Sequence, residues 1–104
     1  MGLAIFEDYS QSKEGTNYAP FIVNISQVLC YDKILKWVKD NNFNKIIPYK
    51  DFFEIFYEDD GFEITISIEN HKDNALVNVS VFGKRGKTRK KLISVLNELV
   101  KVFN

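Results

Sequence analysis

The feature that most constrains the fold is a regular alternation of apolar and polar residues between positions 53 and 82. The apolar residues occupy every second position in three consecutive runs: Phe53, Ile55 and Tyr57; then Phe62, Ile64, Ile66 and Ile68; then Val77, Val79 and Val81. A period of two, with β-branched and aromatic residues, is typical of strands that bury one face. The sequence therefore predicts three consecutive β-strands.

The connections between these runs predict an antiparallel meander. Asp60-Gly61 separates the first two runs, and both residues tolerate the positive φ angles of a two-residue hairpin turn. With that turn and a four-residue loop at 71–74, the expected pairs are Tyr57–Ile64, Ile55–Ile66, Phe53–Ile68, Ile68–Val77, Ile66–Val79 and Ile64–Val81. Because a slip of one residue would move the apolar side chains to the other face, the continuous apolar face supports this register.

Two amphipathic helices are predicted to flank the meander in the chain. The first lies between Ser26, a suitable N-cap, and Asn42. Its expected apolar face consists of Val28, Tyr31, Ile34, Leu35, Trp37 and Val38. The second runs from Thr88 to Phe103, and its expected apolar face consists of Leu92, Ile93, Val95, Leu96, Leu99, Val100, Val102 and Phe103. Both faces are suited to packing on one side of a sheet.

The N-terminal quarter of the chain carries a weaker signal. A short strand is expected at 21–25, after Pro20, which an edge strand tolerates. Residues 7–19 have the composition of a loop, and whether residues 1–20 are ordered is left open. The expected fold is a single α+β domain, 1–104, with two layers: a three-stranded antiparallel meander, a candidate fourth strand at its N-terminal edge, and two helices packed on one face.

Composition favours a cytoplasmic protein. The hydrophobic fraction of 45% and the charged fraction of 27% are ordinary for a globular domain. Cys30 is the single cysteine and cannot form an internal disulfide, which favours a reducing compartment. The N-terminus lacks the basic residues and apolar run of a signal peptide, and Phe6 interrupts the myristoylation pattern that begins at Gly2. No segment approaches the roughly 20 apolar residues of a membrane span, so no membrane partner is expected.

Residues that carry catalysis or bind metals are sparse. The only histidine, His71, belongs to a predicted turn, whereas Cys30 belongs to a predicted helix, and nothing in their spacing brings them together. One histidine and one cysteine do not make a zinc site, and the acidic run 58–61 lacks the twelve-residue spacing of a calcium loop. We therefore expect no catalytic residue, no metal and no cofactor, and a protein that is not an enzyme.

The segment 83–91 is the strongest candidate for a binding site. Its candidate anion- or partner-binding residues are Lys84, Arg85, Lys87, Thr88, Arg89, Lys90 and Lys91. The segment follows a predicted strand and begins a predicted helix, where backbone N–H groups and the positive end of the helix dipole attract anions. It is not a nucleotidase phosphate-binding loop, because Val81 occupies the position of the required first glycine. The alternative is a strand–helix connection whose cations are merely solvated.

The charges and the outer face of the sheet suggest two functions. Residues 51–73 contain eight acids and one lysine, whereas 84–91 contain six basic residues and no acid, although the net charge is zero. The outer face also carries Phe52, Phe56, Leu76 and Phe82, which either the N-terminal segment around Leu3, Ile5 and Phe6 or another chain would cover. The first hypothesis is a non-enzymatic protein-interaction module that binds a protein partner or self-associates as a homodimer. The alternative is nucleic-acid or phosphate-ligand binding through the basic segment.

Overall fold

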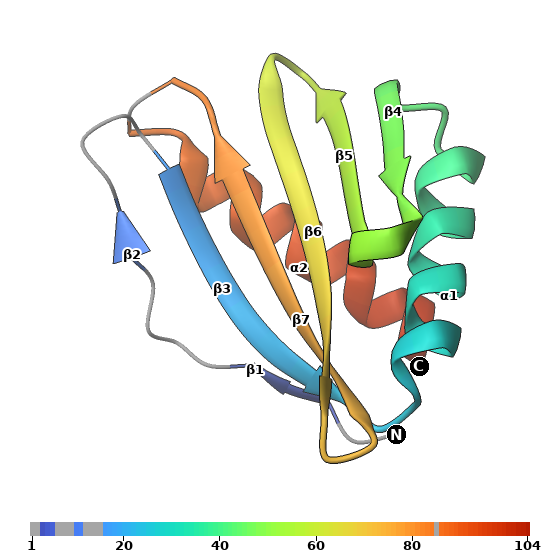
Figure 1. Ribbon diagram of the computed structural model, residues 1–104. Helices are drawn as coiled ribbons and strands as arrows, with labels where there is room; N and C mark the ends of the chain where they lie inside the picture. The colour runs from blue at the N-terminus through green and yellow to red at the C-terminus, as the bar shows by residue number, and fades with distance from the viewer. Residues whose placement is uncertain (1–2, 6–9, 12–15, 85) are drawn as a thin grey trace.

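The structure is an antiparallel β-sheet with two helices on one face. The computed structural model describes residues 3–5, 10–11, 16–84 and 86–104. The elements in chain order are β1 (Leu3–Ile5), β2 (Ser10–Gln11), β3 (Thr16–Val23), α1 (Gln27–Asp40), β4 (Asn44–Tyr49), the 3-10 turn η1 (Lys50–Phe52), β5 (Glu54–Asp59), β6 (Phe62–His71), β7 (Asn74–Phe82) and α2 (Thr88–Phe103). The sheet order is β1-β3-β7-β6-β5-β4, and β2 also pairs with β3. Figure 1 shows α2 behind the strands and α1 beside β4. Residues of both helices share one core with the inward-facing residues of the strands, and the α+β class is confirmed.

The predicted meander β5–β6–β7 is confirmed in its register. Tyr57 lies opposite Ile64, and Ile64 lies opposite Val81. The neighbouring pairs Ile55–Ile66, Ile66–Val79 and Ile68–Val77 also form as expected. Asp60 and Gly61 form the turn between β5 and β6, with φ angles of 53° and 80°. The inward-facing residues of the three strands are buried except Phe62, which is half-buried, so the alternation correctly identified the core face.

Two details of the meander differ from the prediction. The β6–β7 turn contains only Lys72 and Asp73, because His71 and Asn74 pair with each other. Both turn residues have positive φ, and shortening the loop by one residue from each strand leaves the register unchanged. Phe53 lies outside β5, in the left-handed region with φ 53°, because it follows η1. Its carbonyl still accepts a hydrogen bond from the backbone N–H of Ile68 at 2.9 Å.

The predicted N-terminal edge strand is longer than expected and is not at the edge. β3 pairs with β7 from Thr16 to Val23, and β1 and β2 pair with the opposite side of β3. The expected strand at 21–25 is therefore wrong in its limits, and residues 16–19 belong to a strand rather than to a loop. Pro20 lies within β3, opposite Asn78. The sequence between Thr16 and Pro20 has no apolar alternation, which explains why this part of β3 was missed.

A further strand, β4, was not predicted and forms the edge beside β5. Five of its six residues are exposed, so it lacks the apolar alternation of a half-buried strand. A shift in register between Asn44 and Ile47 adds an irregularity, and Lys45 has a φ of 50°. Pro48 is accommodated because an edge strand leaves one row of backbone N–H groups unpaired. The sheet thus extends beyond the predicted meander on both sides.

The helices cover the apolar face of the sheet. The Ser26 hydroxyl caps α1 by accepting a hydrogen bond from the backbone N–H of Leu29 at 3.2 Å. The expected position of Val28 in the core is wrong, because its side chain is 56% exposed, whereas Cys30 is fully buried. The limits of α2 agree with the prediction, and Leu92, Val95, Leu96, Leu99 and Phe103 are buried against the sheet. Neither helix in the part of the chain that the structure describes is long and apolar enough to cross a membrane.

Candidate functional site

The acidic hairpin tip and the basic segment meet at one end of the molecule. Lys91, in the first turns of α2, places its Nζ atom 2.6 Å from Oδ2 of Asp59 at the end of β5. The same Nζ atom lies 3.8 Å from Oδ2 of Asp60 in the turn. The two charged segments are therefore neighbours and partly neutralise each other. Opposite charges that look segregated in the sequence are in contact at this end of the fold.

Two of the seven predicted binding residues are packed against the rest of the fold. The Lys91 side chain is only 14% exposed, and its Nζ atom also lies 5.8 Å from the centre of the Phe62 ring. Thr88 is completely buried on the core side of α2. Lys91, like Lys87 and Arg89, was expected to be exposed, and for Lys91 this is wrong because helical periodicity directs its side of α2 towards the hairpin. Arg85, which was also predicted, lies outside the described residues.

The other predicted basic residues remain exposed at the start of α2. Lys84, Lys87, Arg89 and Lys90 are exposed. The Lys87 backbone N–H donates to the carbonyl of Lys84 at 3.1 Å, and Gly86 within this turn has a φ of 88°. Lys87 occupies the N-cap position without a side-chain capping bond, and the first turn of α2 contains no acidic residue. Positive charge therefore accumulates at the positive end of the helix dipole.

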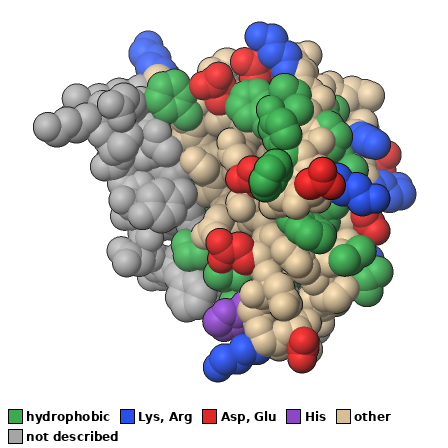
Figure 2. Space-filling model, viewed as in Figure 1, with side chains coloured by type: hydrophobic (Ala, Val, Ile, Leu, Met, Phe, Trp, Pro, Cys, Tyr) green, Lys and Arg blue, Asp and Glu red, His purple; other side chains and the backbone are tan. Residues whose placement is uncertain are grey.

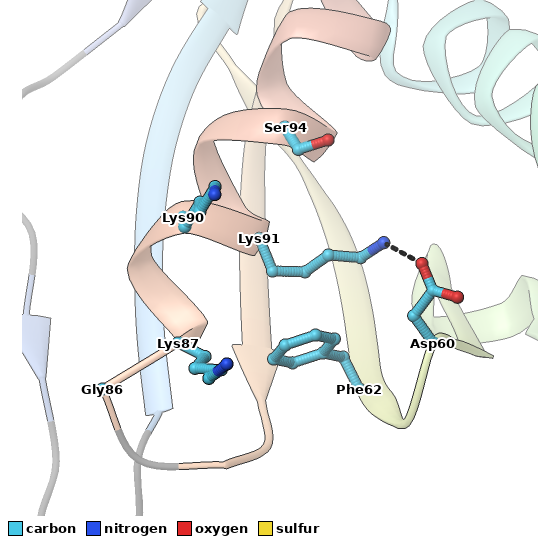
Figure 3. Close-up of a pocket in the computed structure, with 7 residues that line it drawn as sticks. All are labelled: Asp60, Phe62, Gly86, Lys87, Lys90, Lys91 and Ser94. Atoms are coloured by element: carbon cyan, nitrogen blue, oxygen red, sulfur yellow. Dashed lines mark ion pairs between the residues drawn. The ribbon is translucent and has the colours of Figure 1, made fainter.

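These residues line an open pocket of about 490 Å³, which we call the hairpin pocket. Asp60 and Phe62 form one side, and Gly86, Lys87, Lys90, Lys91 and Ser94 form the other. Figure 3 shows the Phe62 ring between the Lys87 side chain and the β5–β6 turn, with the Lys91 stem passing beside it. The sequence predicted the lysines of this pocket from their clustering. It missed Phe62 and Ser94, because only the packing of the hairpin against α2 brings them to the same place.

Gly83 allows the wall of the hairpin pocket to form. A Cβ atom at this position would lie 2.5 Å from an edge atom of the Phe62 ring, closer than side chains tolerate. A larger residue at the end of β7 would therefore force the Phe62 ring to move. Glycine at this position lets the half-buried Phe62 ring pack beside the strand–helix connection.

A second candidate surface lies on the sheet face that the helices leave uncovered. Ile47 and Tyr49 on β4, Phe52 in η1 and Phe56 on β5 form what we call the outer patch; Ile47 and Phe56 are paired across the strands. Ile47 is 40% exposed, Tyr49 48% and Phe52 73%. In Figure 2, which views this face, hydrophobic side chains gather over β4 and β5. The sequence identified Phe52 and Phe56, but Ile47 and Tyr49 were missed because β4 was missed.

The expected N-terminal cover of this face does not form in the described residues. Leu3 and Ile5 belong to β1, which extends the sheet beside β3, opposite Val23 and Phe21. Phe6 lies outside the described residues. β1 also lies at the edge of the sheet opposite β4, so it does not reach the outer patch. Of the other predicted outer residues, Phe82 is 41% exposed and Leu76 is half-buried.

Acidic side chains surround the outer patch. Glu54 lies opposite Tyr49, and Glu58 lies one pleat beyond Phe56, opposite Glu63. Within the described residues, Lys45 forms one ion pair on this face, with its Nζ atom 3.2 Å from Oε2 of Glu58. The patch thus combines aliphatic and aromatic side chains with excess negative charge.

Cys30 and His71 lie in unlike environments. The Cys30 side chain is fully buried in α1, and burial raises the pKa of its thiol to about 12, so it stays neutral at physiological pH. His71 is exposed beside the β6–β7 turn. Across the described ranges, no group of three or more histidine, cysteine or acidic residues is arranged to hold a metal ion.

Comparisons of the chain with protein-family models, with curated proteins and with solved structures find no match. The functional argument therefore depends on the geometry of the two surfaces described above.

Proposed function

We propose that this protein is a non-enzymatic protein-interaction module that binds its partner through the outer patch. The observation that carries the proposal is the exposure of Ile47 and Tyr49 on one face of β4, beside Phe52, which is 73% exposed and lines the same hollow as Tyr49. Clustered exposed aromatic and aliphatic side chains favour association, because burying them releases water from apolar surface. Aromatic residues are also enriched at the centres of protein interfaces.

The charges around the patch indicate the chemistry of the partner. Glu54, Glu58 and Glu63 lie on the same sheet face, and only Glu58 is paired with a lysine among the described residues. A partner with apolar side chains flanked by lysine or arginine would complement this surface. A second copy docked face to face would bring the same glutamates together, which disfavours a homodimer through this patch.

The edge strand β4 is expected to bind a partner through its side chains rather than through backbone hydrogen bonds. β4 carries a register irregularity near Lys45 and a proline at position 48, and both interrupt the ladder that an added strand would need. We therefore propose that the partner docks on side chains of the outer patch and does not extend the sheet. The location in the cytoplasm remains a prediction from composition.

A random peptide library displayed on phage would test this proposal. We expect enriched peptides to combine aliphatic or aromatic residues with lysine or arginine. Phe52→Ala and Ile47→Thr should weaken the selected peptides about tenfold or more, as loss of a central apolar contact does at interfaces. Ile93→Ala is the matched control, because Ile93 is 39% exposed on α2 and should not affect binding.

Three outcomes would contradict the proposal in different ways. Enrichment of acidic peptides would overturn the predicted partner chemistry. Equal loss of binding in Ile93→Ala and Phe52→Ala would show that the outer patch is not the interface. Sedimentation that reveals a dimer broken by Phe52→Ala would replace the basic partner with a second copy of this chain.

A further inference from the structure

The hairpin pocket is a second site that the outer patch does not explain. It lies between the β5–β6 turn and the start of α2, whereas the outer patch covers β4, η1 and β5. Its volume of about 490 Å³ falls within the range of small-molecule sites, which is about 300–1,000 Å³. Its lining offers a ligand an aromatic ring, lysine ammonium groups, a hydroxyl and a carboxylate.

The cationic side of the pocket is suited to a phosphate group. Lys87 and Lys90 are exposed and form no ion pair with any described residue, whereas Lys91 is already paired with Asp59. Both unpaired lysines lie in or next to the first turn of α2, which has no acidic residue. The positive end of the helix dipole adds to their field, and an anion there would relieve the repulsion between them.

The aromatic side of the pocket is suited to a planar group. The Phe62 ring is half-buried, and Gly83 permits it to pack against the end of β7. In Figure 3 the ring lies within the pocket, between Lys87 and the turn that carries Asp60. Aromatic rings prefer to stack on or meet the edges of other flat groups, so this wall favours a ligand with a ring.

The acidic rim limits the size of the ligand. The Asp60 side chain is 82% exposed at the mouth of the pocket, where it can accept hydrogen bonds from a hydroxyl or amino group. Glu58 and Glu63 lie at the same end of the β5–β6 hairpin but on the opposite sheet face, where a longer ligand that extends past the turn would meet them. A long polyanion would pass these carboxylates and be repelled, whereas a small ligand with one phosphate end would not.

We propose that the hairpin pocket binds a small phosphorylated ligand with a planar ring, of the size of a mononucleotide. The phosphate contacts Lys87 and Lys90, and the ring lies against Phe62. Asp60, on the far side of the ring from Lys87, is placed to accept a hydrogen bond from the polar part of the ligand. This inference is independent of the proposed protein interaction, because the two sites share no residue.

Amide chemical shifts of the full chain, recorded during titration with AMP, would test the inference. We expect shifts in residues 60–62 and 86–94, and binding about tenfold tighter than that of adenosine or of inorganic phosphate alone. The double variant Lys87→Gln/Lys90→Gln should weaken AMP about tenfold, because each lysine makes a charge-assisted contact. The matched control Lys33→Gln/Lys39→Gln removes the same charge from exposed positions on α1 and should bind normally.

The ring contact has its own variant. Phe62→Leu should weaken AMP severalfold while leaving the weak binding of inorganic phosphate unchanged. Absence of shifts in these residues at millimolar AMP would overturn the inference, as would equal losses in the two lysine double variants. Tighter binding of a single-stranded oligonucleotide than of AMP, with a steep dependence on salt, would replace the small ligand with nucleic acid.

Discussion

Replacing Lys91 by methionine should destabilise the fold, although the residue belongs to a cluster of surface cations in the sequence. Methionine keeps most of the apolar stem and removes the ammonium group that lies 2.6 Å from Asp59. The Lys91 side chain is 14% exposed and that of Asp59 is 30% exposed, so the pair lies between exposed pairs and buried pairs. Exposed pairs contribute about 0.2–1 kcal/mol, and breaking a buried pair costs about 3–5 kcal/mol. We therefore expect Lys91→Met to lower the free energy of unfolding by about 2 kcal/mol.

Urea denaturation monitored by circular dichroism would measure this loss, with Lys90→Met as the matched control. Lys90 is exposed and has no ion pair with a described residue, so its replacement should change stability by less than about 0.5 kcal/mol. A double-mutant cycle with Asp59→Asn should give a coupling of about 1–2 kcal/mol. A loss below about 0.5 kcal/mol for Lys91→Met, or equal losses for both lysines, would refute the structural role of this ion pair.

Three further predictions concern the core. Ile66→Ala should lower the free energy of unfolding by about 3 kcal/mol and Ile66→Val by about 1 kcal/mol, because Ile66 is fully buried between Ile55 and Val79. If chemical denaturation shows that Ile66→Ala lowers it by less than about 1 kcal/mol, the register is contradicted. Tyr57→Phe should leave stability unchanged or raise it by up to about 1 kcal/mol, because the buried hydroxyl has no hydrogen-bond partner among the described residues. A loss of stability of more than about 1 kcal/mol, measured by calorimetry, would show that the hydroxyl has a partner. Cys30 should react with a thiol reagent only as fast as the protein opens. Because its pKa rises from 9.0 to about 12 on folding, the stability it contributes should be complete below pH 9 and decline towards pH 12, and Cys30→Ala should lack that part of the decline.

The meander could be predicted because several signals agreed along one stretch of chain. The apolar alternation defined the buried face, and Asp60-Gly61 defined the turn that sets the register. β3 and β4 could not be predicted in the same way. Part of β3 has no alternation, and β4 is an exposed edge strand that buries little of its own surface. β3 pairs with β7, which is distant in the sequence, and β4 pairs with β5 across a shift in register. No local pattern in the sequence reveals either pairing.

The sequence predicted some of the residues in the candidate sites but not how the fold arranges them. The lysines at 84–91 were evident from the sequence, but their division into exposed Lys87 and Lys90 and paired Lys91 depends on where the β5–β6 turn meets α2. The same contact brings Phe62 into the pocket. The sequence predicted only part of the outer patch. Phe52 and Phe56 occur on the polar side of the alternation, whereas Tyr49 belongs to β4, which was not predicted.

The location of binding on the chain tests the proposed function most directly. Amide chemical shifts should be recorded while the strongest apolar and basic peptide from the library is added to the protein. The proposed function predicts that the shifts concentrate in residues 44–59, which span β4, η1 and β5, and that Phe52→Ala strongly reduces them at the same peptide concentration. Shifts confined to residues 83–94, or an unchanged response in Phe52→Ala, would contradict an interaction through the outer patch.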